Sequence, residues 1–133
     1  MNIIISEPWF SIIVLVSRIC LGLVFLISGV HKIIWFDKAV VEFNNAGVNS
    51  RVIVAATAVL HFAGSLGLIS GVLVPEFSLA LAIFTVIATV QVHNFWAMEG
   101  SMRLERSRVA FANLAIVGGL LLLAATGPGH FVL

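Results

Sequence analysis

Four long apolar runs place the first constraint on this chain. They cover roughly residues 10–35, 52–74, 77–97 and 109–127, and a helix needs about 20 mostly apolar residues to cross a membrane. In lipid, backbone N–H and C=O groups must find partners inside the protein, so runs of this length form helices. The sequence therefore predicts an all-α integral membrane protein. It would be a four-helix bundle with antiparallel up-down topology, in one domain that spans residues 1–133.

Composition supports a membrane location. Only 10% of the residues are charged and 61% are hydrophobic, with a mean hydropathy of +1.17. Soluble domains carry about 25% charged residues, so this chain cannot cover a water-facing surface. A net charge of +1 provides no basic footprint for nucleic acid. We therefore expect membrane lipids as surroundings and no nucleic-acid partner.

The basic residues predict an orientation. Six of the seven Lys and Arg lie in or beside the first and third connections between spans: Lys32, Lys38, Arg51, Arg103, Arg106 and Arg108. The positive-inside rule places such connections in the cytoplasm. With four spans, both termini are then expected outside the cytoplasm.

The first connection, residues 37–50, predicts either a short amphipathic helix or an irregular polar loop. Val40, Val41 and Phe43 alternate with polar residues in it, and an amphipathic helix can lie in the membrane interface. Gly47 is placed to end such a helix in a left-handed conformation.

A stripe of special residues runs along the first span, at Arg18, Gly22, Phe25, Gly29 and Lys32. Spacings of three and four place them on one helix face. Charged residues inside a span usually face the bundle interior, and glycines allow another backbone to come close. This stripe is therefore expected to face the other helices.

Arg18 lies too deep in the span to reach water and needs a partner. Glu76, His61, backbone carbonyls at a helix end and a bound anion are candidates, and the sequence favours Glu76 or the carbonyls. In the second span, glycines at spacings of three and four predict close helix packing. The residues expected to be structural within the membrane are Arg18, Gly22, Gly29, Gly64, Gly67 and Gly71.

A layer of polar side chains is expected near one end of the bundle, because a helix rises about 1.5 Å per residue. The ligand-binding candidates in this layer are Lys32, Gln91, His93, Asn94 and Asn113. Such a cluster could bind the head of an amphiphile such as a quinone, with its tail between the helices. Alternatively, the same residues only hydrogen-bond across helices, and Lys32 extends to the interface.

Two histidines, His61 and His93, are candidates for catalytic proton transfer, because imidazole titrates near neutral pH. The catalytic residues themselves stay unknown, and the sequence leaves open whether the chain is an enzyme. A haem between these histidines is disfavoured by their different depths and by the lack of a CxxCH motif. No Cys/His cluster has zinc-ligand spacing, and the single cysteine, Cys20, excludes thiol–disulfide chemistry by this chain alone.

The chain resembles the DoxX family of small four-helix membrane proteins. The resemblance rests on the stripe of the first span and on the glycines of the second. It also rests on Ala88-Thr89, His93-Asn94-Phe95, Asn113, Gly118-Gly119-Leu120 and Gly127-Pro128-Gly129. One departure is His61, which stands where the family commonly has a Glu; a histidine can carry protons but cannot neutralise Arg18.

The resemblance implies a bacterial inner-membrane location and a link to membrane-bound oxidoreduction, including a thiosulfate:quinone oxidoreductase subunit. On this reading the chain belongs to a quinone-linked redox system, with Lys32, His93 and Asn113 holding the quinone head. No residue is an evident electron carrier, so electrons would come from partner subunits or a bound cofactor. The alternative is a non-catalytic accessory subunit packed against a larger membrane complex.

Overall fold

The computed structural model describes residues 6–133. Within that range the chain forms five α-helices and one short 3-10 helix, with no strand. Their bounds are α1 Trp9–Ile34, α2 Phe36–Asn45, α3 Arg51–Ser70, α4 Val74–Val92, η1 Phe95–Ala97 and α5 Gly100–Thr126. Four of the helical segments are long and apolar enough to cross a membrane. The predicted all-α membrane architecture is confirmed.

Helix ends differ from the predicted spans where backbone geometry, not hydropathy, decides. The second span was expected to reach residue 74, but α3 ends at Ser70 because Gly71 adopts a left-handed φ of +89°. The third was expected to reach residue 97, but α4 ends at Val92 and η1 follows. The fourth was expected from residue 109, yet α5 begins at Gly100. Its first turns are polar and basic, so an apolar run locates only the part of this helix that suits lipid.

The first connection contains α2, which confirms the short amphipathic helix. Val40 is buried on one side, while Asp37 and Lys38 are exposed. The helix ends at Asn45, and Gly47 follows with a left-handed φ of +86°. Without a Cβ, glycine adopts this conformation without steric cost.

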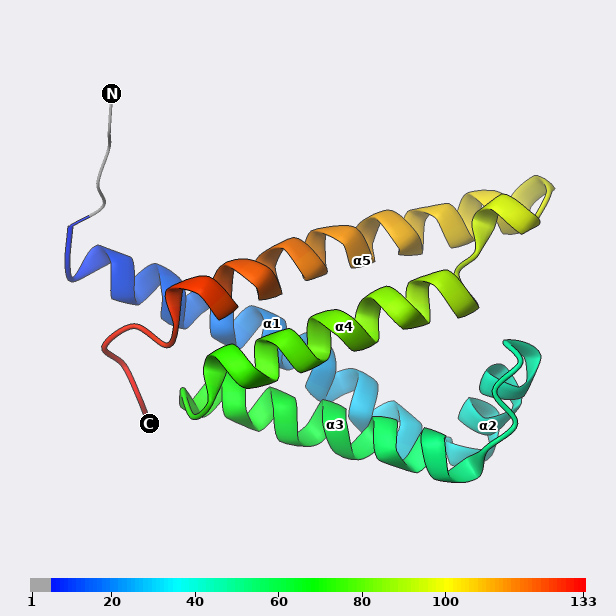
Figure 1. Ribbon diagram of the computed structural model, residues 1–133, viewed down its shortest axis with the longest axis horizontal. Coiled ribbons are helices and arrows are strands. Elements are labelled where there is room, and N and C mark those ends of the chain that lie inside the picture. Colours follow the sequence, from blue (N-terminus) through cyan, green and yellow to red (C-terminus); the bar gives the residue numbers. More distant parts are fainter. Residues whose placement is uncertain (1–5) are drawn as a thin grey trace.

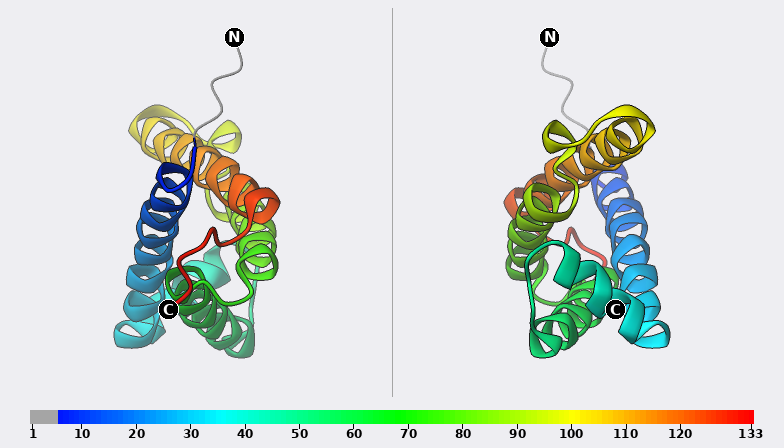
Figure 2. Two further views of the ribbon diagram at one scale, coloured as in Figure 1. Left: turned by 90° about the vertical axis from the view of Figure 1, so that its left-hand side faces the viewer. Right: turned by 90° about the vertical axis from the view of Figure 1, so that its right-hand side faces the viewer.

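The four long helices form two pairs (Figure 1). α1 packs most extensively against α3, and α5 against α4, with smaller contacts between the pairs. Successive long helices alternate in direction, as the up-down topology requires. The pairs meet at the end that holds both chain termini, here named the terminal end, and separate toward α2, here named the α2 end. The two end-on views show the same divergence (Figure 2).

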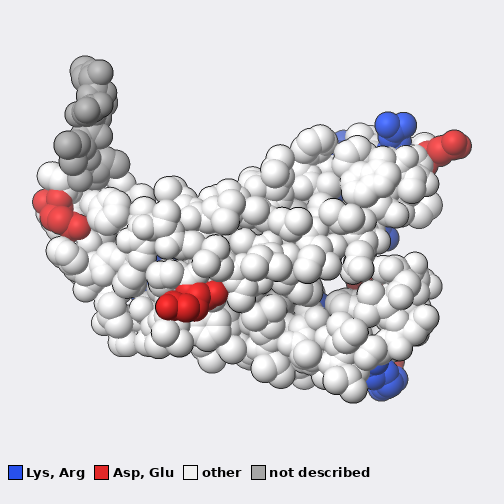
Figure 3. All heavy atoms as spheres, in the orientation of Figure 1, with Lys and Arg blue, Asp and Glu red and all other residues white. Residues whose placement is uncertain are grey.

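The core lies between the pairs, toward the terminal end. Leu68, Leu81 and Leu120 are fully buried and belong to one cluster with Phe25 and Val74. At the α2 end the surface is instead hollowed between the two helix pairs (Figure 3). Most of the Lys and Arg side chains visible on this face lie at that end. The fold therefore has one closed end and one open end.

Arg18 holds the closed end together. The side chain is fully buried. Its Nε donates to the carbonyl of Leu68 at 2.7 Å and its Nη2 to that of Ile69 at 2.7 Å. Its Nη1 donates to the carbonyls of Pro128, at 2.8 Å, and Phe131. Of the partners that the sequence favoured, the backbone carbonyls are the ones found.

The other favoured partner, Glu76, is exposed and is not among the hydrogen-bond partners of Arg18 in the described part of the chain. The two carbonyls from α3 belong to its last turn, whose C=O groups lack helical partners. The other two come from the tail after α5, which folds back over the end of the bundle. One guanidinium thus joins α1, α3 and the tail.

Candidate ligand pocket

A cavity of about 190 Å³, here named the inner cavity, lies where the two pairs begin to diverge. All five α-helices border it, α4 partly through its C-terminal cap residue His93. Its polar lining consists of Ser28, Lys32, Glu42, His61, Thr85, His93 and Asn113, and its apolar lining includes Phe25, Phe84 and Ile116. The structure thus brings four sequence-predicted residues, Lys32, His61, His93 and Asn113, to one cavity.

His61 is the most enclosed polar side chain of this lining. It is 3% exposed. The rings of Phe25 and Phe84 contact it edge-on, with centroid distances of 5.2 Å and 4.8 Å. Its Nδ1 lies 3.1 Å from Ser28 Oγ, and Lys32 Nζ donates to that same oxygen at 2.7 Å.

The Ser28 hydroxyl links Lys32 to the His61 ring. An ammonium group can only donate, so Ser28 Oγ accepts from Lys32; toward Nδ1 the hydroxyl donates or accepts, according to the tautomer of His61. When Ser28 donates to Nδ1, a neutral His61 carries its proton on Nε2. Among the described residues, Nε2 is buried and has no hydrogen-bond partner. Buried polar groups nearly always have partners, so Nε2, when it carries the proton, is a donor suited to an added acceptor.

Asn113 and His93 each bind a neighbouring element. Asn113 Nδ2 donates to Thr89 Oγ1 at 2.9 Å, which ties α5 to α4. Arg106 donates to His93 Nδ1 at 3.2 Å. The sequence-based alternative, that these residues hydrogen-bond across helices, therefore describes part of what they do.

The other two ligand-binding candidates lie apart from the inner cavity. Gln91 and Asn94 line a hollow of about 590 Å³ between α2, α4 and α5, beside Arg106. Gln91 is exposed, and Asn94 follows the end of α4. The sequence predicts a similar depth in the membrane for all five ligand-binding candidates. Depth alone, however, does not determine the direction in which each side chain points.

Sequence reasoning missed three polar lining residues, Ser28, Glu42 and Thr85. A signal for Ser28 existed, because it stands four residues before Lys32 and therefore on the same helix face. Glu42 is carried by α2, whose position relative to the bundle could not be derived from hydropathy. Across residues 6–133 no group of three or more His, Cys, Asp or Glu side chains converges as a metal site would need.

Fold and pocket define a class of protein: a four-span helical membrane protein with a small polar cavity inside its bundle. The chain belongs to the DoxX family, whose profile matches residues 13–94, more than half of the sequence.

Two curated relatives come from Escherichia coli K12. The inner membrane protein YphA is 28% identical over 119 residues, covering 89% of this chain and 85% of the relative. The inner membrane protein YqjF is 33% identical over 118 residues, covering 89% and 86%. No solved structure matches significantly.

Proposed function

We propose that the inner cavity binds the carbonyl-bearing head of an amphiphile, a quinone, as part of a membrane-bound redox system. The observation that carries this proposal is the buried Nε2 of His61, which has no hydrogen-bond partner among the described residues. A quinone oxygen accepts hydrogen bonds, and a buried donor without a partner has an unfavourable free energy of about 1–3 kcal/mol that an acceptor would relieve.

The size of the cavity favours a head group over a whole ligand. Pockets that enclose a drug-sized molecule measure about 300–1,000 Å³, and the inner cavity measures about 190 Å³. A single ring would occupy it, and an isoprenoid tail would continue along apolar residues such as Val24 and Ile116 toward the lipid.

Lys32 offers a second contact for the ligand. Its ammonium has three N–H groups, and one of them binds Ser28. The remaining two would be free to donate to a ligand oxygen. Because no lining residue carries electrons, the redox partner would be another subunit or a bound cofactor. We therefore place this chain as the quinone-binding subunit of a larger assembly.

The accessory-subunit alternative also has support. The bonds from Asn113 to Thr89 and from Arg106 to His93 already join neighbouring elements of the chain. On this alternative the inner cavity is a packing defect between the diverging helix pairs. The chain would then act only by packing its surface against other subunits.

Equilibrium binding of a labelled short-chain quinone to the purified protein in lipid nanodiscs separates the two. The protein should bind quinone, and His61→Phe should weaken binding about tenfold, because it removes a donor hydrogen bond. Gln91→Leu, outside the inner cavity, is the control and should bind as the native protein does. Absence of binding, with larger redox subunits still co-purifying, would favour the accessory role.

A further inference from the structure

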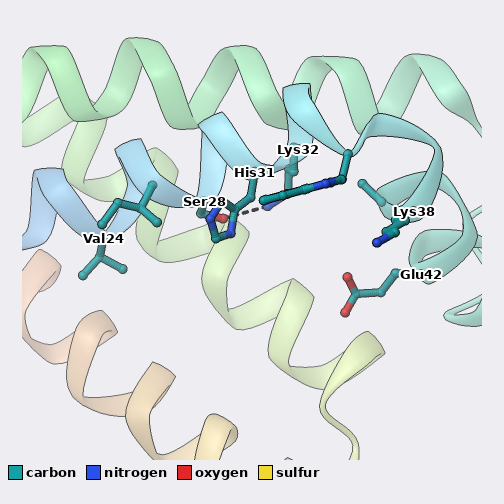
Figure 4. Close-up of a pocket in the computed structure, with 9 residues that line it drawn as sticks. Val24, Ser28, His31, Lys32, Lys38 and Glu42 are labelled. Atoms are coloured by element: carbon teal, nitrogen blue, oxygen red, sulfur yellow. Dashed lines mark hydrogen bonds between the residues drawn. The ribbon is translucent and has the colours of Figure 1, made fainter.

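A second hollow of about 620 Å³, here named the α1–α2 cavity, lies between the end of α1 and the amphipathic helix α2 (Figure 4). Its basic side chains are His31, Lys32 and Lys38, and its single carboxylate is Glu42. Val24 and Ile27 supply an apolar wall on the α1 side. A polar head and an apolar chain would therefore meet different parts of the same cavity.

The position of the cavity fits the membrane surface. It is bordered by Trp35, at the junction of α1 and α2, which is 46% exposed. The His31 ring packs edge-on against Trp35 at a centroid distance of 5.0 Å. Tryptophan at the end of a span favours the headgroup level. The polar part of the cavity therefore lies among lipid head groups, and the apolar wall extends toward the acyl chains.

Two charges in this cavity are unpaired within the described chain. Lys38 and Glu42 are four residues apart on α2, a spacing at which opposite charges often pair, yet neither side chain makes a hydrogen bond or ion pair there. Nearby, Asp37 of the same helix is paired with Arg51 at 3.0 Å. In Figure 4, Lys38 and Glu42 face the same hollow as the hydrogen-bonded Ser28 and Lys32.

We propose that the α1–α2 cavity binds one membrane phospholipid whose head carries both a phosphate and a primary ammonium group. Lys32 and Lys38 donate to the phosphate, Glu42 accepts from the ammonium, and an acyl chain follows Val24 and Ile27. Two cations and one carboxylate match this zwitterionic head better than a purely anionic one. The α1–α2 cavity shares Val24, Ser28, Lys32 and Glu42 with the inner cavity, so a lipid here and a ligand there would compete for Lys32.

Trp35 provides a direct probe of this site. A variant with Trp9→Phe and Trp96→Phe keeps Trp35 alone, in nanodiscs of phosphatidylcholine. A small share of lipid brominated near the glycerol end of its chains is added, as phosphatidylethanolamine, phosphatidylglycerol or phosphatidylcholine. Brominated phosphatidylethanolamine should quench Trp35 about fivefold more effectively than brominated phosphatidylcholine. This ratio is the difference in binding that one favourable charge contact at a membrane surface, about 1 kcal/mol, would produce. Phosphatidylglycerol should lie between them.

Variants then assign the preference to the two charges. Glu42→Gln should remove the advantage of phosphatidylethanolamine over phosphatidylglycerol, and Lys38→Gln should weaken quenching by both. Glu105→Gln and Arg103→Gln change exposed charges of α5 that do not border this cavity, and should leave the preference intact. Equal quenching by the three lipids, or phosphatidylglycerol quenching at least as well as phosphatidylethanolamine, would overturn the proposal.

Discussion

At the scale of single residues, two buried polar groups behave in opposite ways. Arg18 directs its guanidinium at four backbone carbonyls, whereas one nitrogen of His61 has no partner in the described chain. The sequence predicted that Arg18 is buried and in need of acceptors. It could not identify these acceptors, because two of them, the carbonyls of Pro128 and Phe131, lie 110 and 113 positions further along the chain.

Replacing Arg18 by Leu should destabilise the protein by about 3 kcal/mol, because carbonyls that it now satisfies lose their donor inside an apolar bundle. Reversible unfolding by SDS in mixed micelles, followed by circular dichroism, measures the change. Cys20→Ala, on the exposed side of the same helix, is the control and should stay within about 0.5 kcal/mol. Equal stability of the two variants would contradict this role of Arg18.

Replacing Ser28 by Ala should change the tautomer of His61. We expect the native Ser28 hydroxyl to donate to Nδ1 and so to favour the proton on Nε2; without this hydroxyl, the Nδ1–H form becomes accessible as well. Nitrogen-15 NMR of the labelled histidine should show the Nε2–H form in the native protein and a mixture in the variant. Quinone affinity should fall together with the Nε2–H fraction. A native protein with the proton on Nδ1 would refute the assignment.

At the scale of secondary-structure elements, glycines set how closely the helices approach. A Cβ added at Gly67 would lie 2.2 Å from Phe77 Cδ2, and one at Gly64 would lie 2.8 Å from Leu81 Cδ1. The expectation that Gly64 and Gly67 allow close packing agrees with these distances. These neighbours, Phe77 and Leu81, belong to α4, which follows α3 after a short turn. Hydropathy alone could indicate that these two helices are adjacent. The exact helix ends could not be predicted, because Gly71 and residues 93–99 turn for local backbone reasons.

Gly67→Ala and Gly118→Ala should shift stability in opposite directions. The first forces a methyl group against Phe77 and should cost about 1–3 kcal/mol. The second adds a methyl group with no atom within 4 Å, and should stabilise α5 by up to about 1 kcal/mol through helix propensity. Thermal unfolding in detergent compares them. Stabilisation by Gly67→Ala would show that α3 and α4 are packed less tightly than described.

At the scale of the whole molecule, the tail after α5 closes one end of the bundle. Besides the two carbonyls bound by Arg18, the Leu133 N–H donates to the Ser70 carbonyl at 2.7 Å, and the His130 N–H donates to Ser11 Oγ at 3.1 Å. The Gly127-Pro128-Gly129 sequence predicted the end of the last helix. It did not predict that the following residues return to α1 and α3.

Deleting residues 128–133 should loosen the terminal end selectively. Amide hydrogen exchange in the first turns of α1 and the last turn of α3 should accelerate about tenfold, because these turns lose their contacts with the tail while the α2 end does not. Mass spectrometry of peptides from both ends measures this. Uniform acceleration along all helices, or none, would contradict a local closing role for the tail.

Fastening at one end alone has a mechanical consequence. α5 has 27 residues and is therefore about 40 Å long, with its far end beyond the reach of the guanidinium. A pivot of about 5° around the fastened end would displace the opposite tip by roughly 3 Å over that length. The two helix pairs can thus pivot about the terminal end. The α2 end then opens for a bulky ligand, while the hydrogen bonds of Arg18 at the terminal end are kept.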